Sequence, residues 1–389
     1  MARVKQVDVM LVAAGMLSGL SMSGLTPVLP QIEAAFADSA GIAYLGKLVV
    51  SVVGLAILLT APLAAPAVRR FGAQRVLMTA FAVYALAATA GGLAPSIYAL
   101  IASRFVQGVC VATGVTTALA LINTLYQGGA RDRRVGMHVA VSALLLSAVL
   151  PLGGWLGETS WRLTPLLGAI SLVHLLLAVR ARGELAHAMI GTPGPGGRLS
   201  VDRGSLAFMA ALALVVGIAM YSPPVILPFK AATIGVTAAG QIGLLSTLQM
   251  IVATAASLFY GSISTRFAAR TVYFGAFGLA GIGTLGVALA GDWMQLAFAL
   301  MVAGIGGGTL VPHLFAENAG RVGAADQVRV AGILKSASFL GLFVGPLLMQ
   351  SIMDASSPAG VFVALAVLNA VTLVATQLRG PAPAVALAR

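Results

Sequence analysis

The sequence predicts an all-α integral membrane protein in which two six-helix repeats supply twelve transmembrane helices. Three observations support this prediction. Apolar residues make up 59% of the 389 residues and charged residues only 9%, far below the roughly 25% charged content of soluble domains. Long apolar runs recur along the whole chain. Short segments of the first half also return in the second half.

Twelve apolar runs are long enough to cross a hydrocarbon core of about 30 Å. The first half contains six of them, at Val9–Leu29, Ala43–Ala64, Val76–Leu93, Ile97–Ile122, Val135–Leu156 and Leu163–Val179. The second half contains six more, at Leu206–Leu227, Ile242–Ser262, Val272–Ala290, Trp293–Phe315, Val330–Met353 and Val361–Leu378. Because the first run exceeds the roughly 7–15 apolar residues of a signal peptide, we expect it to be retained as a span.

The chain is divided by a polar break, Arg180–Gly204, whose TPGPGG run cannot hold a helix. On either side of the break, Leu25–Pro30 returns as Pro223–Pro228, and Arg69–Arg75 returns as Thr265–Arg270. These returns indicate a duplication. We therefore predict an N-terminal six-helix bundle (1–180), a cytoplasmic linker (181–204) and a C-terminal six-helix bundle (205–389).

The distribution of basic residues predicts that both termini are cytoplasmic. With that orientation, eighteen of the 23 lysines and arginines fall on the inner side, as the positive-inside rule requires. The outer side holds three basic residues, Lys47, Arg162 and Lys230, and five acids, Glu33, Asp38, Glu158, Asp292 and Asp354. An odd number of spans would erase this asymmetry. We expect a multi-pass protein of the plasma membrane, with a bacterial inner membrane favoured.

Several segments resemble motifs of the major facilitator superfamily. The fourth span contains Arg104–Gly108, which matches the family's Arg-x-x-Gln-Gly signature, and the loop after span two keeps the motif core Arg70–Gly72, although Arg69 stands at the family's acidic position. Span five keeps Pro151 of the exporters' glycine-proline motif, and Gly345–Pro346 in span eleven fits the first half of that motif. The chain therefore resembles this superfamily along its whole length, and in particular its drug-export branch of twelve-span proton antiporters.

This resemblance implies that the repeats are related by a pseudo-twofold axis along the membrane normal and that transport proceeds by alternating access. It implies that spans one, four, seven and ten line a central cavity and that Arg104 borders the transport path. Residues expected to serve the conformational change are the prolines Pro27, Pro30, Pro151, Pro223, Pro224 and Pro346, together with Arg70, Gly72, Gly306 and Gly345. For the prolines and glycines, simple helix packing is the alternative.

Ionisable residues inside spans are costly and are therefore candidate functional residues. Arg104 should face the interior of its bundle, where it either contacts the substrate or acts as a packing residue bonded to backbone carbonyls. Lys335 in span eleven is positioned to form an inner gate with Glu317, for which an interfacial salt bridge is the alternative. Lys47 lies near the outer end of span two, so we expect it to snorkel to the interface.

Proton coupling is assigned to the cytoplasmic end of span ten. His313 and Glu317 are four residues apart on one helix face, and histidine titrates near neutral pH. A packing histidine is the alternative, and Asp8 at the mouth of span one is the next candidate. The residues expected to complete the substrate site with Arg104 are neutral and polar: Gln107, Thr113, Tyr221, Ser222 and Gln249.

A transporter fits these features better than two other classes of protein. An intramembrane enzyme would need a third ligand or a nucleophile with its base, and a sensor would need a cytoplasmic interaction domain. The phosphate loop of an ATPase is missing from the sequence, and the single cysteine, Cys110, excludes a disulfide framework. We predict a monomeric protein that is not an enzyme, uses no cofactor or metal and binds no nucleic acid. Its expected partners are the lipid bilayer, protons and a small organic solute, anionic or neutral, which it exports. Organic-anion uptake or facilitated transport is the alternative, and an intramembrane enzyme is a remote one.

Overall fold

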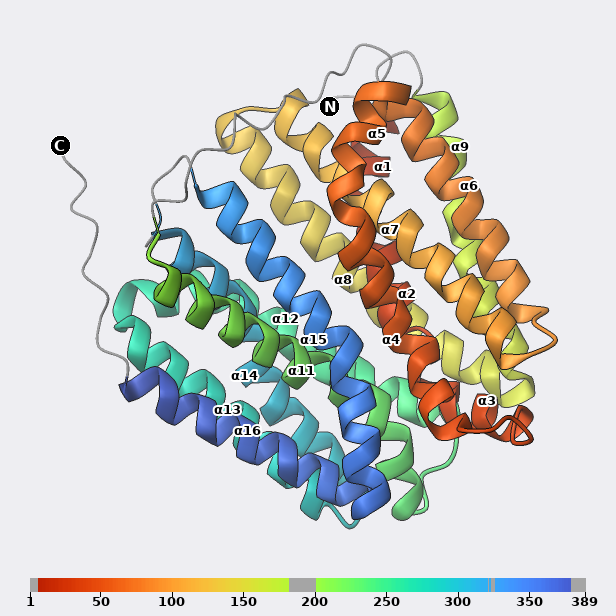
Figure 1. Cartoon of the computed structure of the whole chain (residues 1–389), viewed down its shortest axis with the longest axis vertical. Helices are drawn as coiled ribbons and strands as arrows, with labels where there is room; N and C mark the ends of the chain where they lie inside the picture. Colours follow the sequence, from red (N-terminus) through yellow and green to blue (C-terminus); the bar gives the residue numbers. More distant parts are fainter. Residues whose placement is uncertain (1–5, 182–200, 321, 323–325, 379–389) are drawn as a thin grey trace. The chain divides into compact units, whose positions relative to one another are not determined.

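The computed structural model describes residues 6–181, 201–320, 322 and 326–378, and every regular element among them is a helix (Figure 1). Twelve stretches of the described chain are helical, long and apolar enough to cross a membrane. The predicted all-α class and the predicted number of spans are confirmed. Most of the predicted linker lies outside the described residues.

The first half of the chain supplies six spans. Span one is composed of α1 (Gln6–Ala13), α2 (Met16–Ser23), η1 (Thr26–Val28) and α3 (Leu29–Ala35). The other five are α4 (Ile42–Thr60) with η2 (Ala61–Leu63) and α5 (Ala64–Phe71), α6 (Ala73–Gly92), α7 (Ile97–Leu125), α8 (Gly128–Thr159), and η3 (Trp161–Leu163) with η4 (Pro165–Ile170) and α9 (Ser171–Arg180).

The second half supplies six spans, each a single unbroken helix. They are α11 (Arg203–Thr233), α12 (Ala239–Arg266), α13 (Ala269–Leu289), α14 (Trp293–Gly320), α15 (Gln327–Ala355) and α16 (Pro358–Leu378).

The helices form two compact units, which we call the N-terminal unit (Met1–Gly194 with Ala238–Leu244) and the C-terminal unit (Pro195–Thr237 with Leu245–Arg389). In the N-terminal unit α7 packs against both α4 and α6. In the C-terminal unit α11 packs along α15, and α13 packs against α14 and α16 (Figure 1).

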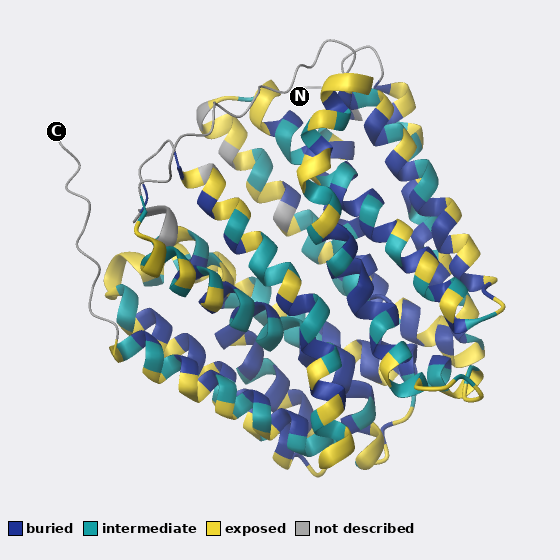
Figure 2. Cartoon of the chain, viewed as in Figure 1, coloured by how far each residue is buried: buried dark blue, intermediate teal, exposed yellow. Residues whose placement is uncertain are grey.

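Burial follows the pattern expected of helices whose solvent is lipid. Faces where helices of one unit meet are buried, whereas other faces carry exposed large apolar side chains (Figure 2). Leu86 on α6 is 70% exposed and Leu258 on α12 is 72% exposed. Lipid tails are as apolar as leucine, so no hydrophobic force drives helices together inside a membrane. The helices associate through close packing and polar contacts, and small residues allow their backbones to approach.

Span one is interrupted where its sequence is rich in glycine and proline. The helix breaks at Ala14–Gly15 and again before η1, which contains Pro27, while Pro30 lies in the first turn of α3. At the first break, His138 on α8 supplies a hydrogen bond to the backbone of span one: its Nδ1 donates to the Leu11 carbonyl at 2.7 Å. Span seven has no matching break, since Pro223 and Pro224 both lie inside the continuous helix α11, and their part in the conformational change stays a prediction.

The glycines of span ten do not interrupt it either. The span is the continuous helix α14, and its glycines lie where neighbouring helices approach closely. A β-carbon on Gly306 would lie 2.4 Å from the Ala280 backbone nitrogen of α13, and one on Gly308 would lie 2.0 Å from the Ala253 carbonyl oxygen of α12. These close approaches favour helix packing, which is the alternative that the sequence left open, and the conformational role of Gly306 stays a prediction.

The expectation for Lys47 is wrong. Its side chain does not snorkel but is fully buried, and its Nζ forms an ion pair with Glu33 Oε1 at 2.7 Å. Gly46 makes room for that carboxylate, because a β-carbon there would lie 2.2 Å from Glu33 Oε1. The pair joins α3 to α4 at the predicted outer end of the N-terminal unit. A nearby acid from another helix is a better partner for a buried ammonium than a distant interface.

Removal of one member of this ion pair should destabilise the protein more than removal of both. Lys47→Met leaves the half-buried Glu33 carboxylate unpaired, and breaking a fully buried pair costs about 3–5 kcal/mol, which is the upper bound here. In the double variant Glu33→Gln/Lys47→Met no charge remains, so thermal unfolding in detergent should return most of the way to the wild-type temperature. Equal melting temperatures for the single and double variants would show that the ion pair does not stabilise the protein.

Candidate functional site

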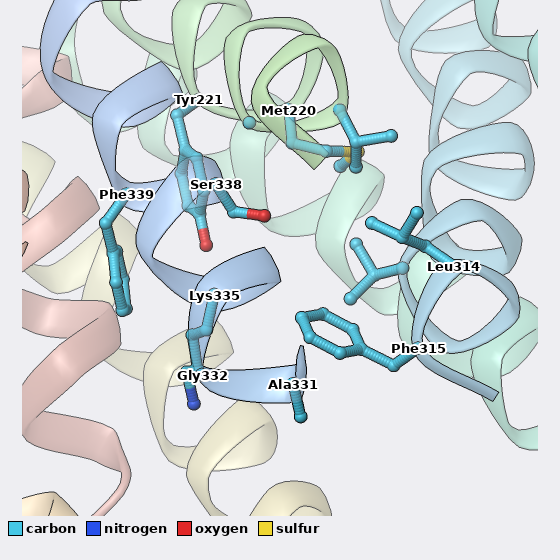
Figure 3. A pocket seen from close by; sticks show the side chains of 12 residues that line it. Met220, Tyr221, Leu314, Phe315, Ala331, Gly332, Lys335, Ser338 and Phe339 are labelled. Atoms are coloured by element: carbon cyan, nitrogen blue, oxygen red, sulfur yellow. The ribbon is translucent and has the colours of Figure 1, made fainter. Parts of the chain in front are cut away.

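The C-terminal unit contains a cavity of about 510 Å³ between α11, α14 and α15. Sites for small organic ligands commonly have volumes of roughly 300–1,000 Å³. The walls of this cavity are largely apolar and aromatic (Figure 3), and none of its lining residues is acidic. Those residues are Val216, Gly217, Met220, Tyr221, Val311, Leu314, Phe315, Ala331, Gly332, Lys335, Ser338 and Phe339.

Two polar groups in this cavity are available to a ligand. Within the described chain, the Lys335 ammonium and the Tyr221 hydroxyl have no hydrogen bond or ion pair. The third polar side chain, Ser338, is already used, because its hydroxyl lies 3.1 Å from the Ala213 carbonyl oxygen and 3.0 Å from that of Leu334. The cavity thus offers one cation and one hydroxyl against an apolar background.

The cavity is shaped by close packing of α11 on α15. A β-carbon on Gly217 would lie 2.3 Å from the Ser338 carbonyl oxygen, and one on Gly341 would lie 2.4 Å from the Leu214 carbonyl oxygen. These glycines bring the two backbones together, and Lys335 and Phe339, one turn apart on α15, both line the space beside them (Figure 3).

Of the residues predicted to bind substrate, only Tyr221 lines this cavity. Lys335 also lines it, although the sequence suggested a gate with Glu317. Sequence reasoning missed Phe315, Ser338 and Phe339. The spacing of Ser338 and Phe339 at three and four residues after Lys335 was an available signal, because those positions share a helix face with the lysine.

Arg104 lies in the N-terminal unit and is 3% exposed. Its guanidinium donates through Nε to the Val49 carbonyl at 3.3 Å, through Nη1 to Gln107 Oε1 and through Nη2 to the Ser21 carbonyl. Gly108 allows this arrangement, since a β-carbon there would lie 2.6 Å from Ala56 Cβ on α4. The geometry therefore favours the packing alternative for Arg104: the side chain joins α2, α4 and α7.

The remaining predicted binding residues lie elsewhere. Gln107 is occupied by Arg104 through its oxygen, and Ser222 is fully buried against α15, where it faces Gly345. Thr113 bonds to carbonyls of its own helix, and Gln249 on α12 does not line the cavity. Their roles in binding stay predictions.

His313 is held at the junction of three helices. Its ring is 3% exposed, its Nε2 donates to the Ala269 carbonyl of α13 at 2.9 Å, and its Nδ1 lies 3.1 Å from the Tyr260 hydroxyl of α12. The ring also makes an edge contact with Tyr273, with a centroid separation of 4.2 Å. With Nε2 protonated, neutral His313 accepts from Tyr260; a second proton on Nδ1 requires only that the Tyr260 hydroxyl turn to accept. Glu317 follows one turn later on α14.

Asp8 belongs to a separate cluster at the start of span one. Its carboxylate forms a two-pronged ion pair with Arg134, at 3.0 Å from Nε and 3.1 Å from Nη2, and also accepts a hydrogen bond from the Tyr126 hydroxyl. The Arg134 guanidinium lies 3.6 Å from the centroid of the Tyr126 ring. Burial, and then the bond to Asp8, raise the pKa of Tyr126 above its ordinary value. This cluster joins α1 to α8 through Arg134 and to the connection between α7 and α8 through Tyr126.

The predicted conformational residues occupy varied positions. Gly72 has φ +82°, which a residue with a β-carbon rarely adopts, and this conformation ends α5 and begins α6 within one residue. Arg70 lies with its guanidinium 5.5 Å from the centroid of the Phe71 ring. Pro151 and Pro346 lie inside the continuous helices α8 and α15.

Comparison with known proteins assigns the fold to a family. The model of the Major Facilitator Superfamily matches residues 11–205 and 207–387, and the chain belongs to this superfamily. Structural neighbours include the nucleoside transporter NupG (TM-score 0.79, 11% identity, 96% of this chain and 99% of that chain). They also include a bacterial homologue of the human lysosomal transporter Spinster in an inward-facing, occupied conformation (TM-score 0.80, 14% identity, 97% and 98%). The protein is thus a multi-pass membrane protein with the fold of a transporter.

Relatives among characterised proteins are named for drug resistance. The chain is 26% identical over 371 residues to the class G tetracycline resistance protein of Vibrio anguillarum, with 90% of this chain and 91% of that protein covered. It is 38% identical over 94 residues to the puromycin resistance protein of Streptomyces alboniger, but this match covers only 24% of the chain and 19% of that protein. These matches agree with the resemblance to the drug-export branch.

Proposed function

We propose that the protein is a secondary active transporter that exports a small organic solute by alternating access, coupled to protons. The observation that carries the substrate class is the cavity of the C-terminal unit, in which Lys335 and Tyr221 face apolar and aromatic walls without partners in the described chain. An organic anion with an apolar body fits this chemistry best, and a neutral solute with a hydrogen-bond acceptor fits next.

The sign of the preference follows from the charge of the cavity. Two unit charges about 4 Å apart interact with about 4 kcal/mol at an effective dielectric constant of 20. This interaction attracts an anion to Lys335 and repels a cation, while water in an open cavity weakens both effects. None of the residues that line the cavity is acidic, so no carboxylate of its wall offsets the lysine.

Proton coupling is proposed for His313, supported by its place beside Tyr260 and one turn before Glu317 on α14. The distribution of basic residues supports an orientation with both termini in the cytoplasm, and the bacterial relatives named for resistance support export from a bacterial inner membrane. In this proposal the protein transports its solute as a monomer, catalyses no reaction and uses no cofactor.

Transport into sealed proteoliposomes tests the substrate class and the coupling together. The panel contains an aromatic monocarboxylate, its neutral amide and a permanently cationic aromatic of similar size, each assayed with a pH gradient imposed in either direction. We expect the carboxylate to be concentrated best, and the gradient direction that drives it shows whether the protein exports or imports. A cation as the best substrate would contradict the proposed site.

Loss of the proposed proton carrier should separate coupling from binding. His313→Gln/Glu317→Gln should abolish concentrative transport on a pH gradient, while exchange of the solute down its own gradient continues, because neither residue lines the cavity. His174→Gln, on α9 in the N-terminal unit, is the matched control and should leave coupling intact. Undiminished concentration by the double variant would place the coupling elsewhere, with Asp8 as the next residue to replace.

A further inference from the structure

The N-terminal unit contains a second hollow that the proposed function does not use. It is an apolar groove of about 410 Å³, and its residues come from α5, α6 and α7. The wall from α5 and α6 contains Ala67, Phe71, Arg75, Val76, Thr79, Ala80 and Val83, and the part from α7 contains Val109, Cys110 and Thr113. We call it the α5–α7 groove.

The shape of the groove suits an extended hydrocarbon chain. Arg75 and Val83, which both line it, are separated along α6 by about 12 Å at 1.5 Å per residue. One leaflet contributes about 15 Å to a hydrocarbon core of roughly 30 Å. The groove is open to its surroundings, since Phe71 is 53% exposed and Thr79 is exposed as well.

Positive charge is concentrated at one end of the groove. Arg75 is the one charged residue that lines it, and the Arg70 guanidinium lies 5.5 Å from the centroid of the Phe71 ring that forms part of its wall. Arg69 precedes them at the end of α5. Within the described chain, none of these three arginines has an ion pair or hydrogen bond.

The acids whose side chains are described in this unit do not neutralise this end. Among the described carboxylates of the N-terminal unit, Asp8 is paired with Arg134 and Glu33 with Lys47. Asp38 follows α3 and Glu158 lies at the far end of α8, both in segments that the charge pattern places on the outer side. An apolar groove with an unneutralised basic end is complementary to a molecule that has a hydrocarbon chain and an anionic head.

We propose that the α5–α7 groove is a binding site for an anionic phospholipid of the cytoplasmic leaflet. One acyl chain would lie along Val76, Thr79 and Val83, and the phosphodiester would contact Arg75 and Arg70. The proposed orientation places these arginines at the cytoplasmic surface, where anionic lipid headgroups attract basic residues. This site is independent of the cavity of the C-terminal unit, and it does not require that the protein be a transporter of anions.

Native mass spectrometry of the full-length protein tests the headgroup preference. The purified protein is given an equal mixture of phosphatidylglycerol and phosphatidylcholine with identical acyl chains. We expect bound phosphatidylglycerol to exceed bound phosphatidylcholine by roughly tenfold or more, because each basic residue near an anionic lipid contributes a factor of about five. Arg75→Gln and Arg70→Gln should each reduce that ratio about fivefold. Arg75→Lys, which keeps the charge, should retain most of the preference.

Matched controls separate the groove from the general positive charge of the protein. Arg266→Gln removes an exposed arginine at the end of α12 and should leave the ratio unchanged. Thr79→Phe fills the groove without changing any charge, and it should weaken retention of both lipids. Equal retention of the two lipids by the wild type, or the same loss in Arg266→Gln as in Arg75→Gln, would overturn the proposal. Displacement of the lipid by glycerol phosphate alone would also overturn it, because a free phosphate would then be sufficient.

The only cysteine of the chain provides a second measurement in vesicles. Cys110 lines the groove and is 7% exposed, so a small membrane-permeable thiol reagent reports on this site without background from other cysteines. Modification should be slower in vesicles containing phosphatidylglycerol than in pure phosphatidylcholine, and Arg75→Gln should remove the difference. The same rate in both vesicles for the wild type would exclude an anionic lipid from the groove.

Discussion

Replacement of Lys335 by glutamine should lower the affinity for an anionic solute by roughly 10- to 100-fold, which corresponds to the loss of one charge-assisted hydrogen bond. The ammonium lines the cavity and has no partner within the described chain, so a ligand would supply the missing counter-charge. Lys335→Arg keeps the charge and should retain most of the affinity. Binding is measured by quenching or calorimetry with the aromatic carboxylate, and the neutral amide serves as the reference ligand.

Stability provides the control for this prediction. Because Lys335 makes no protein hydrogen bond in the described chain, Lys335→Met should fold and melt at the wild-type temperature or above it. Tyr221→Phe removes only the hydroxyl. It should lower the affinity for the anion less than tenfold, as expected for the loss of a neutral hydrogen bond. If Lys335→Gln bound the carboxylate and the amide as the wild type does, the anion site would not be in this cavity.

Replacement of Arg104 by glutamine should instead destabilise the N-terminal unit. The guanidinium supplies hydrogen bonds to the buried carbonyls of Val49 and Ser21 and to the side chain of Gln107. Each buried group left unsatisfied costs about 1–3 kcal/mol, so the melting temperature should fall by roughly 5–20 °C. Arg104→Lys should be nearly as destabilising, because one ammonium cannot reproduce a planar fork that reaches three elements.

The same pair of variants distinguishes the two interpretations of Arg104. If the residue serves packing, folded Arg104→Gln protein keeps its affinity for the carboxylate when assayed well below its melting temperature. If the residue contacts the substrate, the protein melts as the wild type does and loses the anion selectively. The contacts of Arg104 lead us to expect the first result.

Hydropathy within single segments, together with the half-chain repeat, was sufficient to predict the fold. Lipid imposes long, apolar, internally hydrogen-bonded helices, and each of the twelve spans is visible as an uninterrupted apolar run. The half-chain repeat and the Arg104–Gly108 motif led to the correct superfamily. Helix continuity was harder to predict: the same residue type, proline, lies at a break in span one but inside the continuous helix α11. Neighbouring helices decide whether a freed backbone group is satisfied, and hydropathy does not contain that information.

The sequence by itself therefore determined the class of protein, the number of spans and the short set of ionisable residues within them. Only the tertiary structure decided which of those charges were already neutralised or bonded. Lys47 meets Glu33 from 14 residues away, Arg104 meets Ser21 from 83 residues away and Arg134 meets Asp8 from 126 residues away. Lys335 has no such partner in the described chain and lines a cavity. The physical reason is that a charge inside a membrane is satisfied by groups on other helices, whereas the pattern along one helix shows only that the charge is there.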